Sequence, residues 1–220
     1  MQASTTSRRE ISERERVFQQ GLAFSFCKRF IDFLGAAVLL LLTLPLLVVA
    51  AILIKAEDGG PVLYRRRVVG LHGTFDAFKL RSMRVDADDV LDQDAALRRE
   101  FLINFKLKDD PRVTRVGALL RRFSVDELPQ LWNVLRDEMS LVGPRMITPA
   151  ELEKFGDAAW IFTSVKPGLT GYWQVQGSTE RGYAERVRVD LWYAENRSTA
   201  LDLMILLKTP LRVLRGTRTS

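Results

Sequence analysis

The sequence predicts a mostly α-helical protein that contains one short β-hairpin and is anchored in a membrane by a single apolar segment. The anchor is indicated by the run from Phe33 to Ile54, which has no charged residue and would form a helix roughly 33 Å long, enough to cross a bilayer core. The hairpin is indicated by an alternating segment over 61–80 with Gly70 and Gly73 near its centre. Apolar residues at helical spacing dominate much of the remaining chain.

The composition excludes several common kinds of active site. The chain has 220 residues, 47% of them hydrophobic, which is enough for one compact domain besides the membrane segment. Cys27 and His72 are the only residues of their types, so a disulfide framework, a Cys- or His-rich metal site and a Ser/His triad all lack components. The cysteine usage fits a reducing compartment. The net charge of +6 and pI near 9.7 favour phosphate-bearing partners of any kind.

Whether the apolar segment crosses the bilayer or turns back is a separate question. Pro45 lies near its middle, where a proline removes a helical hydrogen bond and favours a kink. Both flanks are basic, with Lys28 and Arg29 before the segment and Lys55 after it, so neither end is clearly the inside one. A re-entrant segment and a kinked but ordinary transmembrane helix are both consistent with these features. A secretory signal fits less well, because the run is long and has no clear cleavage site.

These patterns divide the chain into a polar lead-in over residues 1–27, a membrane helix over 28–55 and a globular domain over 56–220. Within the domain, the spacing predicts a helix over 86–106, two helical pieces that meet near Ser124 and end at Gly143, a turn-rich loop over 165–177 and a charged surface helix over 183–196. The apolar stretch from Leu201 to Leu214 also carries basic residues, so it fits a helix along a membrane surface as well as a core helix.

An acidic cluster marks the start of the predicted 86–106 helix. Its members are Asp86, Asp88, Asp89, Asp92 and Asp94. They could be drawn as a metal cluster, but acidic side chains are also favoured in the first turn of a helix. We therefore interpret them as a solvated helix start.

The adjacent carboxylates Asp126 and Glu127 are the main candidates for chemistry. Ser124 and Glu127 also match the S-x-x-E capping box, in which they would only close a helix start. Pro129 argues against part of that interpretation, because with Asp126 as N-cap it takes the third helical position, where its missing N–H loses no partner. In that register Asp126 lies at the positive end of a helix, which favours carboxylates and bound phosphates alike. A capping device and a catalytic pair both remain open.

Basic residues grouped with this pair could hold a pyrophosphate. The candidates are Lys79, Arg81, Arg115, Arg121, Arg122 and Arg145. Arg145 is the most suggestive, since Gly143 and Pro144 would fix the backbone before it in a tight turn. Asp126 and Glu127 together with phosphate oxygens would also suit Mg²⁺, which prefers hard oxygen ligands and keeps several waters.

Three segments resemble successive blocks of the bacterial sugar transferase family, the monotopic phosphoglycosyl transferases. They are "GGPVLYRRRVVGLHGTFDAFKLRSM", "DDPRVTRVGALLRRFSVDELPQLWNVLRDEMSLVGPR" and "KPGLTGYWQVQGS". The resemblance spans roughly Lys28 to Pro210 and is most specific from Ser124 to Arg145. Met146 departs from the family, which usually has proline there, but no charged group that the chemistry needs is missing.

The resemblance implies a topology and a location. In the family, a proline bends a helix-break-helix so that it re-enters the cytoplasmic leaflet, and Pro45 occupies that place. Residues 56–220 would then form a cytosolic catalytic domain on the bacterial inner membrane. The family's long forms carry extra transmembrane helices ahead of this core, and we expect this chain to be a small form without them.

The resemblance also implies roles for the charged residues. Asp126 resembles the nucleophile and Glu127 its partner in the dyad, and both resemble magnesium ligands. The expected phosphate-binding residues are Lys79, Arg81, Arg121 and Arg145. Of these, Lys79 and Arg145 match the family's phosphate-site cations, and Arg121 lies where a further active-site arginine is expected.

The activity implied by the resemblance is transfer of a sugar-1-phosphate from a UDP-sugar to polyprenyl (undecaprenyl) phosphate, with Mg²⁺ as cofactor and an aspartyl-phosphosugar intermediate. Such enzymes begin the assembly of exopolysaccharide, O-antigen lipopolysaccharide, capsule or glycoprotein glycans. A non-enzymatic membrane-anchored scaffold of a polysaccharide assembly complex would instead have no need of Asp126. No nucleic-acid partner is expected, because the chain has no recognisable binding motif. The sequence leaves the sugar open and leaves room for a homodimer.

Overall fold

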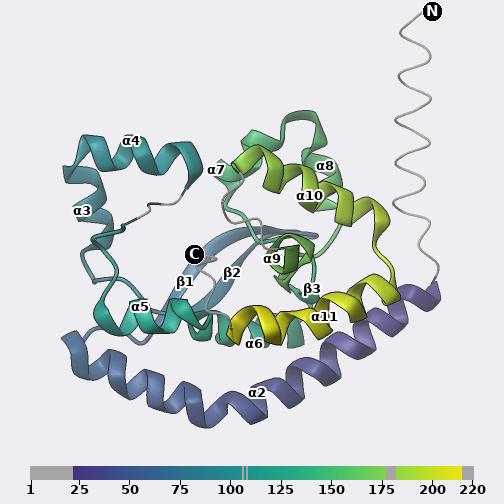
Figure 1. Cartoon of the computed structure of the whole chain (residues 1–220), viewed down its shortest axis with the longest axis horizontal. Coiled ribbons are helices and arrows are strands. Elements are labelled where there is room, and N and C mark those ends of the chain that lie inside the picture. The colour runs from purple at the N-terminus through teal and green to yellow at the C-terminus, as the bar shows by residue number, and fades with distance from the viewer. Residues whose placement is uncertain (1–21, 106, 108, 177–181, 215–220) are drawn as a thin grey trace, which may run out of the picture.

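The computed structural model describes residues 22–105, 107, 109–176 and 182–214, and it confirms a mostly helical fold with one short antiparallel hairpin. The long helix α2 runs along one side of the molecule, and the hairpin and the shorter helices pack on its inner side (Figure 1). Most of the predicted lead-in, residues 1–21, lies outside the described residues.

Along the chain, the long helix is followed by the hairpin and then by shorter helices and two short strands. They are α2 (Leu22–Asp58), β1 (Leu63–Gly70), β2 (Gly73–Leu80), α3 (Ala87–Gln93), α4 (Ala95–Asn104), α5 (Arg115–Arg122), η1 (Val125–Gln130), α6 (Leu131–Leu135), β3 (Ser140–Val142), α7 (Pro149–Leu152), η2 (Glu153–Ala158), α8 (Ala159–Thr163), β4 (Gly168–Thr170), α9 (Tyr172–Gln176), α10 (Tyr183–Asn196) and α11 (Thr199–Leu214). Strands β1 and β2 pair antiparallel, and β3 and β4 pair in parallel.

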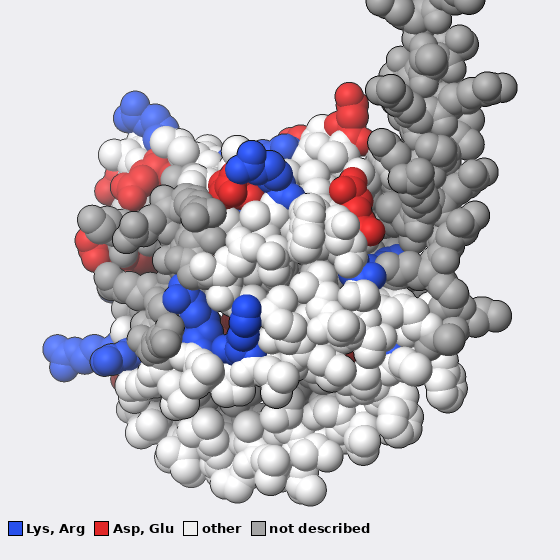
Figure 2. Space-filling view, turned by 45° about the vertical axis from the view of Figure 1, so that its right-hand side comes forward, with Lys and Arg blue, Asp and Glu red and all other residues white. Residues whose placement is uncertain are grey.

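Helix α2 is the one helix, among the residues that the structure describes, that is long and apolar enough to cross a membrane. Most of its apolar side chains are exposed, including Leu41 at 72% and Leu42 at 69%, so it is not the core helix of a soluble domain. The helix continues through Pro45 and is bowed (Figure 1). On the face shown in Figure 2, the base formed by this part of the molecule carries no Lys, Arg, Asp or Glu side chain.

Both ends of α2 are fastened to the same globular domain. Near the start, Lys28 Nζ donates to Asp202 Oδ2 at 2.7 Å, and the buried Asp32 accepts a hydrogen bond from the β3 backbone. At the other end, Arg81 Nη1 donates to Asp58 Oδ2 at 2.6 Å. The charged groups at the helix ends therefore hold the domain on one side of the apolar segment.

The main core lies between α2, the hairpin and the two C-terminal helices. Leu131, Met139, Tyr193 and Ile205 are almost completely buried there, and they bring together segments far apart in the sequence. Burial of such side chains stabilises the fold by roughly 1.5–3 kcal/mol each. This core positions η1 in contact with β2.

Two predicted elements differ from the structure. The helix predicted over 86–106 is two helices, because the backbone of Asp94 is extended and its side chain caps α4 by accepting hydrogen bonds from the N–H groups of Ala96 and Leu97. The loop predicted over 165–177 contains β4 and the short helix α9. Pairing with β3 orders this glycine-rich stretch, and local sequence cannot reveal such a long-range contact.

The last two helices have the predicted extents to within two residues, with more burial than expected in α10. This helix was predicted as a charged surface helix, but Val189, Asp190, Tyr193 and Ala194 are buried on one face. Helix α11 buries Asp202 and Ile205 on one side. Its opposite side exposes a row of leucines: Leu203, Leu207, Leu211 and Leu214. The spacing of three and four residues makes this an amphipathic surface helix.

Candidate active site

The hairpin and the chain after it supply the first charged groups of the site. Lys79 lies near the end of β2. Because side chains alternate along a strand, Lys79 points to the face of the hairpin opposite to that of Phe78 and Leu80. Gly117 lets α5 lie directly against the segment after β2, because a Cβ at this position would be 2.0 Å from the Ser82 carbonyl oxygen. In this position Arg121 Nε donates a hydrogen bond to Ser82 Oγ at 2.8 Å.

Asp126 and Glu127 lie in the first turn of η1 and face Lys79. Lys79 Nζ donates to Glu127 Oε1 at 2.8 Å and lies 3.7 Å from Asp126 Oδ2. Asp126 is only 5% exposed, and the Glu127 side chain is 15% exposed. One ammonium group therefore bridges two carboxylates that would repel each other strongly if no cation lay between them.

The capping-box alternative is not formed. Ser124 adopts the left-handed backbone conformation, with φ of 54°, and its side chain makes no capping hydrogen bond. Glu127, which would be its reciprocal partner, pairs with Lys79 instead. The predicted helix register is also wrong: the 3₁₀ helix begins at Val125 with Ser124 as its N-cap, so Asp126 is inside the first turn and is not the cap.

Arg145 reaches the pair from the loop after β3. Gly143 packs tightly on β4, and a Cβ on it would lie 2.7 Å from the Gly168 nitrogen. The Gly168 N–H then donates to the Pro144 carbonyl at 2.8 Å, which fixes the loop. Arg145 Nη2 consequently lies 3.6 Å from Glu127 Oε1, so cations flank Glu127 from two different segments of the chain.

Arg121 contributes to the site through its charge. Its guanidinium is largely buried, and the charges of Asp126, Asp110 and Glu127 act on it. Burial lowers the pKa of Arg121, because desolvation outweighs the attraction of Asp126. Arg121 is therefore a further positive charge whose field reaches the carboxylate pair, in addition to Lys79 and Arg145.

The structure places Arg81 elsewhere. Its guanidinium pairs with Asp58 at the end of α2, and its Nε donates to the Pro61 carbonyl at 2.6 Å. A further bond goes from Nη1 to the Met83 carbonyl at 3.0 Å. These contacts use the donors of a side chain in a residue that is only 7% exposed, so the structure does not bring Arg81 to the carboxylate pair.

The two carboxyl groups have pKa values that are shifted in opposite directions. Burial raises the pKa of Asp126, because the charge of Lys79 offsets desolvation only in part and Glu127 adds repulsion. Burial also opposes ionisation of Glu127, but the charges of Lys79 and Arg145 outweigh it and lower the pKa of Glu127 to about 2. Such a separation makes Asp126 the more basic of the two carboxylates and keeps Glu127 ionised beside the cations.

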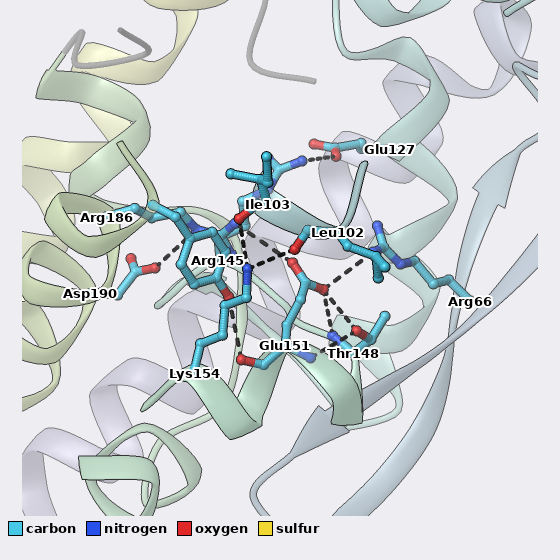
Figure 3. Close-up of polar contacts among 11 residues, drawn as sticks. Arg66, Leu102, Ile103, Glu127, Arg145, Thr148, Glu151, Lys154, Arg186 and Asp190 are labelled. Carbon is cyan, nitrogen blue, oxygen red and sulfur yellow. Dashed lines mark hydrogen bonds and ion pairs between the residues drawn. The ribbon is translucent and has the colours of Figure 1, made fainter. Parts of the chain in front are cut away.

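A buried charge network lies behind Arg145, and the sequence did not indicate it (Figure 3). Glu151 is 4% exposed, and its Oε2 lies 3.3 Å from Arg66 Nη2 while its Oε1 lies 3.9 Å from Arg186 Nη1. Arg186 Nε is in turn 3.6 Å from Asp190 Oδ2. Two arginines from two different elements, Arg66 in β1 and Arg186 in α10, thus meet at Glu151.

Asp190 links this network to the backbone of the Arg145 loop. It accepts a hydrogen bond from the Arg145 N–H, and burial raises its pKa to about 6 although Arg186 opposes the change. The sequence offered one usable signal, because Thr148 and Glu151 have capping-box spacing and do form that box. No local pattern marks Asp190 as part of the site.

A metal ion would have to be shared with the substrate. Among the described residues, no group of three or more Asp, Glu, His or Cys side chains could hold a metal ion. Asp126 and Glu127 supply two hard oxygen donors, and Lys79 already shows that a positive charge is stable between them. This donor set fits Mg²⁺ with phosphate oxygens and waters completing the shell, which is its usual mode of binding.

The comparison with known proteins covers the site and the long helix together. The model of the family described as bacterial sugar transferase matches residues 23–216. The chain belongs to the bacterial sugar transferase family. The match begins inside α2 and includes Lys79, the η1 pair and Arg145.

Three relatives of this bacterial sugar transferase illustrate the range of the family. The UDP-galactose-lipid carrier transferase of Erwinia amylovora is 46% identical over 190 residues, which is 84% of this chain and 39% of that protein. The undecaprenyl-phosphate galactose phosphotransferase of Salmonella typhimurium is 43% identical over 195 residues, covering 86% and 41% of the two chains. The exopolysaccharide production protein ExoY of Rhizobium meliloti is 44% identical over 187 residues, covering 83% of each. The sugar transferase thus spans about two fifths of two relatives and most of the third.

Proposed function

We propose that this bacterial sugar transferase moves a sugar-1-phosphate from a UDP-sugar to polyprenyl phosphate at the cytosolic face of the bacterial inner membrane. The product would begin the assembly of exopolysaccharide, O-antigen, capsule or a glycoprotein glycan. The names of the relatives support a lipid-linked phosphate acceptor and a hexose phosphate donor. The observation that carries the proposal is the buried carboxylate pair held between Lys79 and Arg145.

The first step uses Asp126 as nucleophile. A carboxylate oxygen of Asp126 attacks the phosphorus that carries the sugar, a new P–O bond forms, and the bond to UMP breaks so that UMP leaves with the electron pair. The attacking group needs no separate base once it is ionised. This agrees with a chain that contains a single histidine.

The second step transfers the sugar phosphate to the lipid. An oxygen of polyprenyl phosphate attacks the same phosphorus, and the acyl phosphate bond breaks to restore the Asp126 carboxylate. The oxyanion of the acceptor is already basic, so this step requires no general base either. Both steps exchange one P–O bond for another and leave no net oxidation or reduction.

The other residues neutralise and position the diphosphate. Lys79 and Arg145, which pair with Glu127, can turn toward phosphate oxygens and act at the positions where negative charge increases. Asp126 and Glu127 would hold Mg²⁺, which would act as a Lewis acid on the phosphate oxygens. Glu127 stays ionised and keeps the cations in the site between turnovers.

The geometry of α2 supports a re-entrant anchor. Both its ends bind one globular domain, through Lys28 to Asp202 and through Asp58 to Arg81. A helix that crossed the bilayer would separate these ends by the thickness of the membrane, and both contacts could not then be made by a domain on one side. Bending at Pro45 would satisfy both and keep the site at the level of lipid phosphates.

The test is an assay for the covalent intermediate. The purified enzyme, reconstituted in lipid nanodiscs with Mg²⁺, is incubated with a panel of UDP-sugars without acceptor, and UMP release and intact protein mass are measured. We expect one equivalent of UMP and a sugar phosphate adduct on Asp126. Asp126→Asn should abolish both, whereas Asp76→Asn, which removes an exposed carboxylate of the same hairpin, should leave both unchanged.

Two results would contradict parts of this proposal. UMP release only in the presence of polyprenyl phosphate, with unmodified Asp126 throughout turnover, would replace the covalent mechanism by direct transfer. Full polysaccharide assembly in cells that carry Asp126→Asn would point instead to a non-enzymatic scaffold.

A further inference from the structure

An apolar groove of about 490 Å³ lies between α2 and the hairpin. Its walls come from α2, from both strands of the hairpin, and from the η1 and α6 segment, and every residue that lines it is apolar. The volume is within the range of roughly 300–1,000 Å³ that is usual for small-molecule sites. The α2 wall belongs to the exposed apolar helix, so the groove is continuous with the surface that faces lipid.

The groove and the carboxylate site are built from two shared segments of the chain, β2 and η1. Phe78 and Leu80 line it and flank Lys79 in β2, so the strand presents apolar groups on one face and the site cation on the other. Pro129 also lines the groove, and it is three residues from Asp126 in a 3₁₀ helix. Side chains three residues apart in such a helix are eclipsed, so Pro129 and Asp126 lie on the same side of η1.

We propose that the groove binds the first isoprene units of the polyprenyl phosphate acceptor while the acceptor's phosphate lies at Asp126. This inference rests on the proposed function. The lining offers no charged group to hold a headgroup, so its occupant must be a hydrocarbon chain whose polar end lies outside the groove. Asp126 and the cations around it, on the segments that also line the groove, are the groups that would receive this polar end.

This arrangement explains how one protein handles a polar donor and an apolar acceptor. The donor diphosphate is held on the Lys79 side of β2, and the lipid tail on the opposite side. Only the part of a long isoprenoid chain nearest the phosphate fits in the groove, and the rest stays in the bilayer. The groove should therefore distinguish acceptors by the length and shape of the first isoprene units.

Two neighbouring valines provide a matched test. Val48 lines the groove and Val49 does not, although their exposures are nearly equal at 52% and 53%. Val48→Phe should narrow the groove, while Val49→Phe adds the same group on lipid-exposed surface. We expect Val48→Phe to raise the KM for undecaprenyl phosphate about tenfold and Val49→Phe to change it less than twofold.

A short prenyl phosphate and the acceptor-free reaction complete the experiment. With an acceptor of one isoprene unit, too short to fill the groove, both variants should have the KM of the wild type. Acceptor-free UMP release should also be the same in all three proteins. Trp132→Ala removes a large apolar side chain from the groove wall and introduces no bulky group. It should also raise the KM for the long acceptor, so the test does not depend on Val48→Phe folding correctly.

Each failure has a distinct signature. If the wild type shows no UMP release that depends on polyprenyl phosphate, the proposed function is wrong. If the wild type is active and Val48→Phe equals Val49→Phe with the long acceptor, the groove does not bind the acceptor. Loss of a co-purified phospholipid from Val48→Phe, with unchanged KM values, would assign the groove to a structural phospholipid and overturn the inference.

Discussion

Replacing Asp190 by asparagine tests the buried network behind the site. Asp190 is 1% exposed, and burial raises its pKa from the ordinary 3.8 to about 6 despite the nearby Arg186. At about 1.4 kcal/mol per pKa unit, this difference corresponds to roughly 3 kcal/mol of pH-dependent stability. The variant keeps the shape of the side chain and removes its titration.

The sign follows from which state holds the proton. Below pH 3.8 the Asp190 carboxyl is neutral in the folded and unfolded states, and its burial carries no charge penalty. Between pH 3.8 and 6 the unfolded chain releases the proton while the folded chain retains it, so the stability contributed by this group falls as pH rises. Above pH 6 the full penalty is present. Asp190→Asn should therefore gain about 3 kcal/mol relative to the wild type between pH 3.5 and 7.

The assay is urea unfolding of both proteins in detergent micelles across this pH range. The measured quantity is the difference between the two free energies of unfolding as a function of pH, because asparagine leaves Arg186 without the charge of Asp190 only above about pH 6, where the wild-type carboxyl is ionised. Asp92→Asn serves as a control, since Asp92 is exposed and pairs with Arg98 on the surface. A difference between wild type and Asp190→Asn that stays constant from pH 3.5 to 7 would refute the reasoning.

Three further predictions concern the metal, the anchor and the packing of α5. Chelation of Mg²⁺ should abolish turnover and leave the circular dichroism spectrum unchanged, and full activity in excess chelator would exclude the metal. In the wild type, tags on both termini should be inaccessible to a periplasmic reagent. In Pro45→Ala, the N-terminal tag should become accessible in part of the population. A wild-type N-terminal tag that the reagent reaches would exclude the re-entrant anchor. Gly117→Ala should destabilise the protein by about 2 kcal/mol or more in urea unfolding, because the new Cβ would lie 2.0 Å from the Ser82 carbonyl oxygen. As a control, Gly182→Ala, where a Cβ would meet no atom within 4 Å, should change the free energy of unfolding by less than about 0.5 kcal/mol.

The features that could be predicted from the sequence are those that depend only on short stretches of the chain. The uncharged run over 33–54 and the glycines at the hairpin turn act locally, so the long helix and the β1–β2 hairpin were predicted correctly. The helix over 86–106 was not predicted correctly, because Asp94 caps a new helix only when its own backbone is extended. Local periodicity cannot detect a break when apolar spacing continues on both sides of it.

The residues of the site fall into the same two groups, those that local sequence marks and those that it does not. Adjacent carboxylates such as Asp126 and Glu127 are visible in a sequence, and their resemblance to a known motif selected them. Arg186 and Asp190 are four residues apart in α10, but Glu151 joins them only when α7 and α10 pack together, and each residue has an ordinary local context. Sequence reasoning found the groups that a motif marks and missed those whose partners lie in distant segments.

Arg81 bears on the mechanism in a way that the sequence did not indicate. It was predicted to bind phosphate, and the structure places it between the end of α2 and the strand that carries Lys79. Arg81 and Lys79 are two residues apart, so the contact that fastens Arg81 to Asp58 also fixes where Lys79 lies relative to α2. Because α2 also forms one wall of the apolar groove, the same helix sets the depth of the groove and of the charged site. The anchor is therefore part of the geometry that would bring a lipid phosphate to Asp126, and detaching the end of α2 should impair use of the lipid acceptor before it impairs use of the soluble donor.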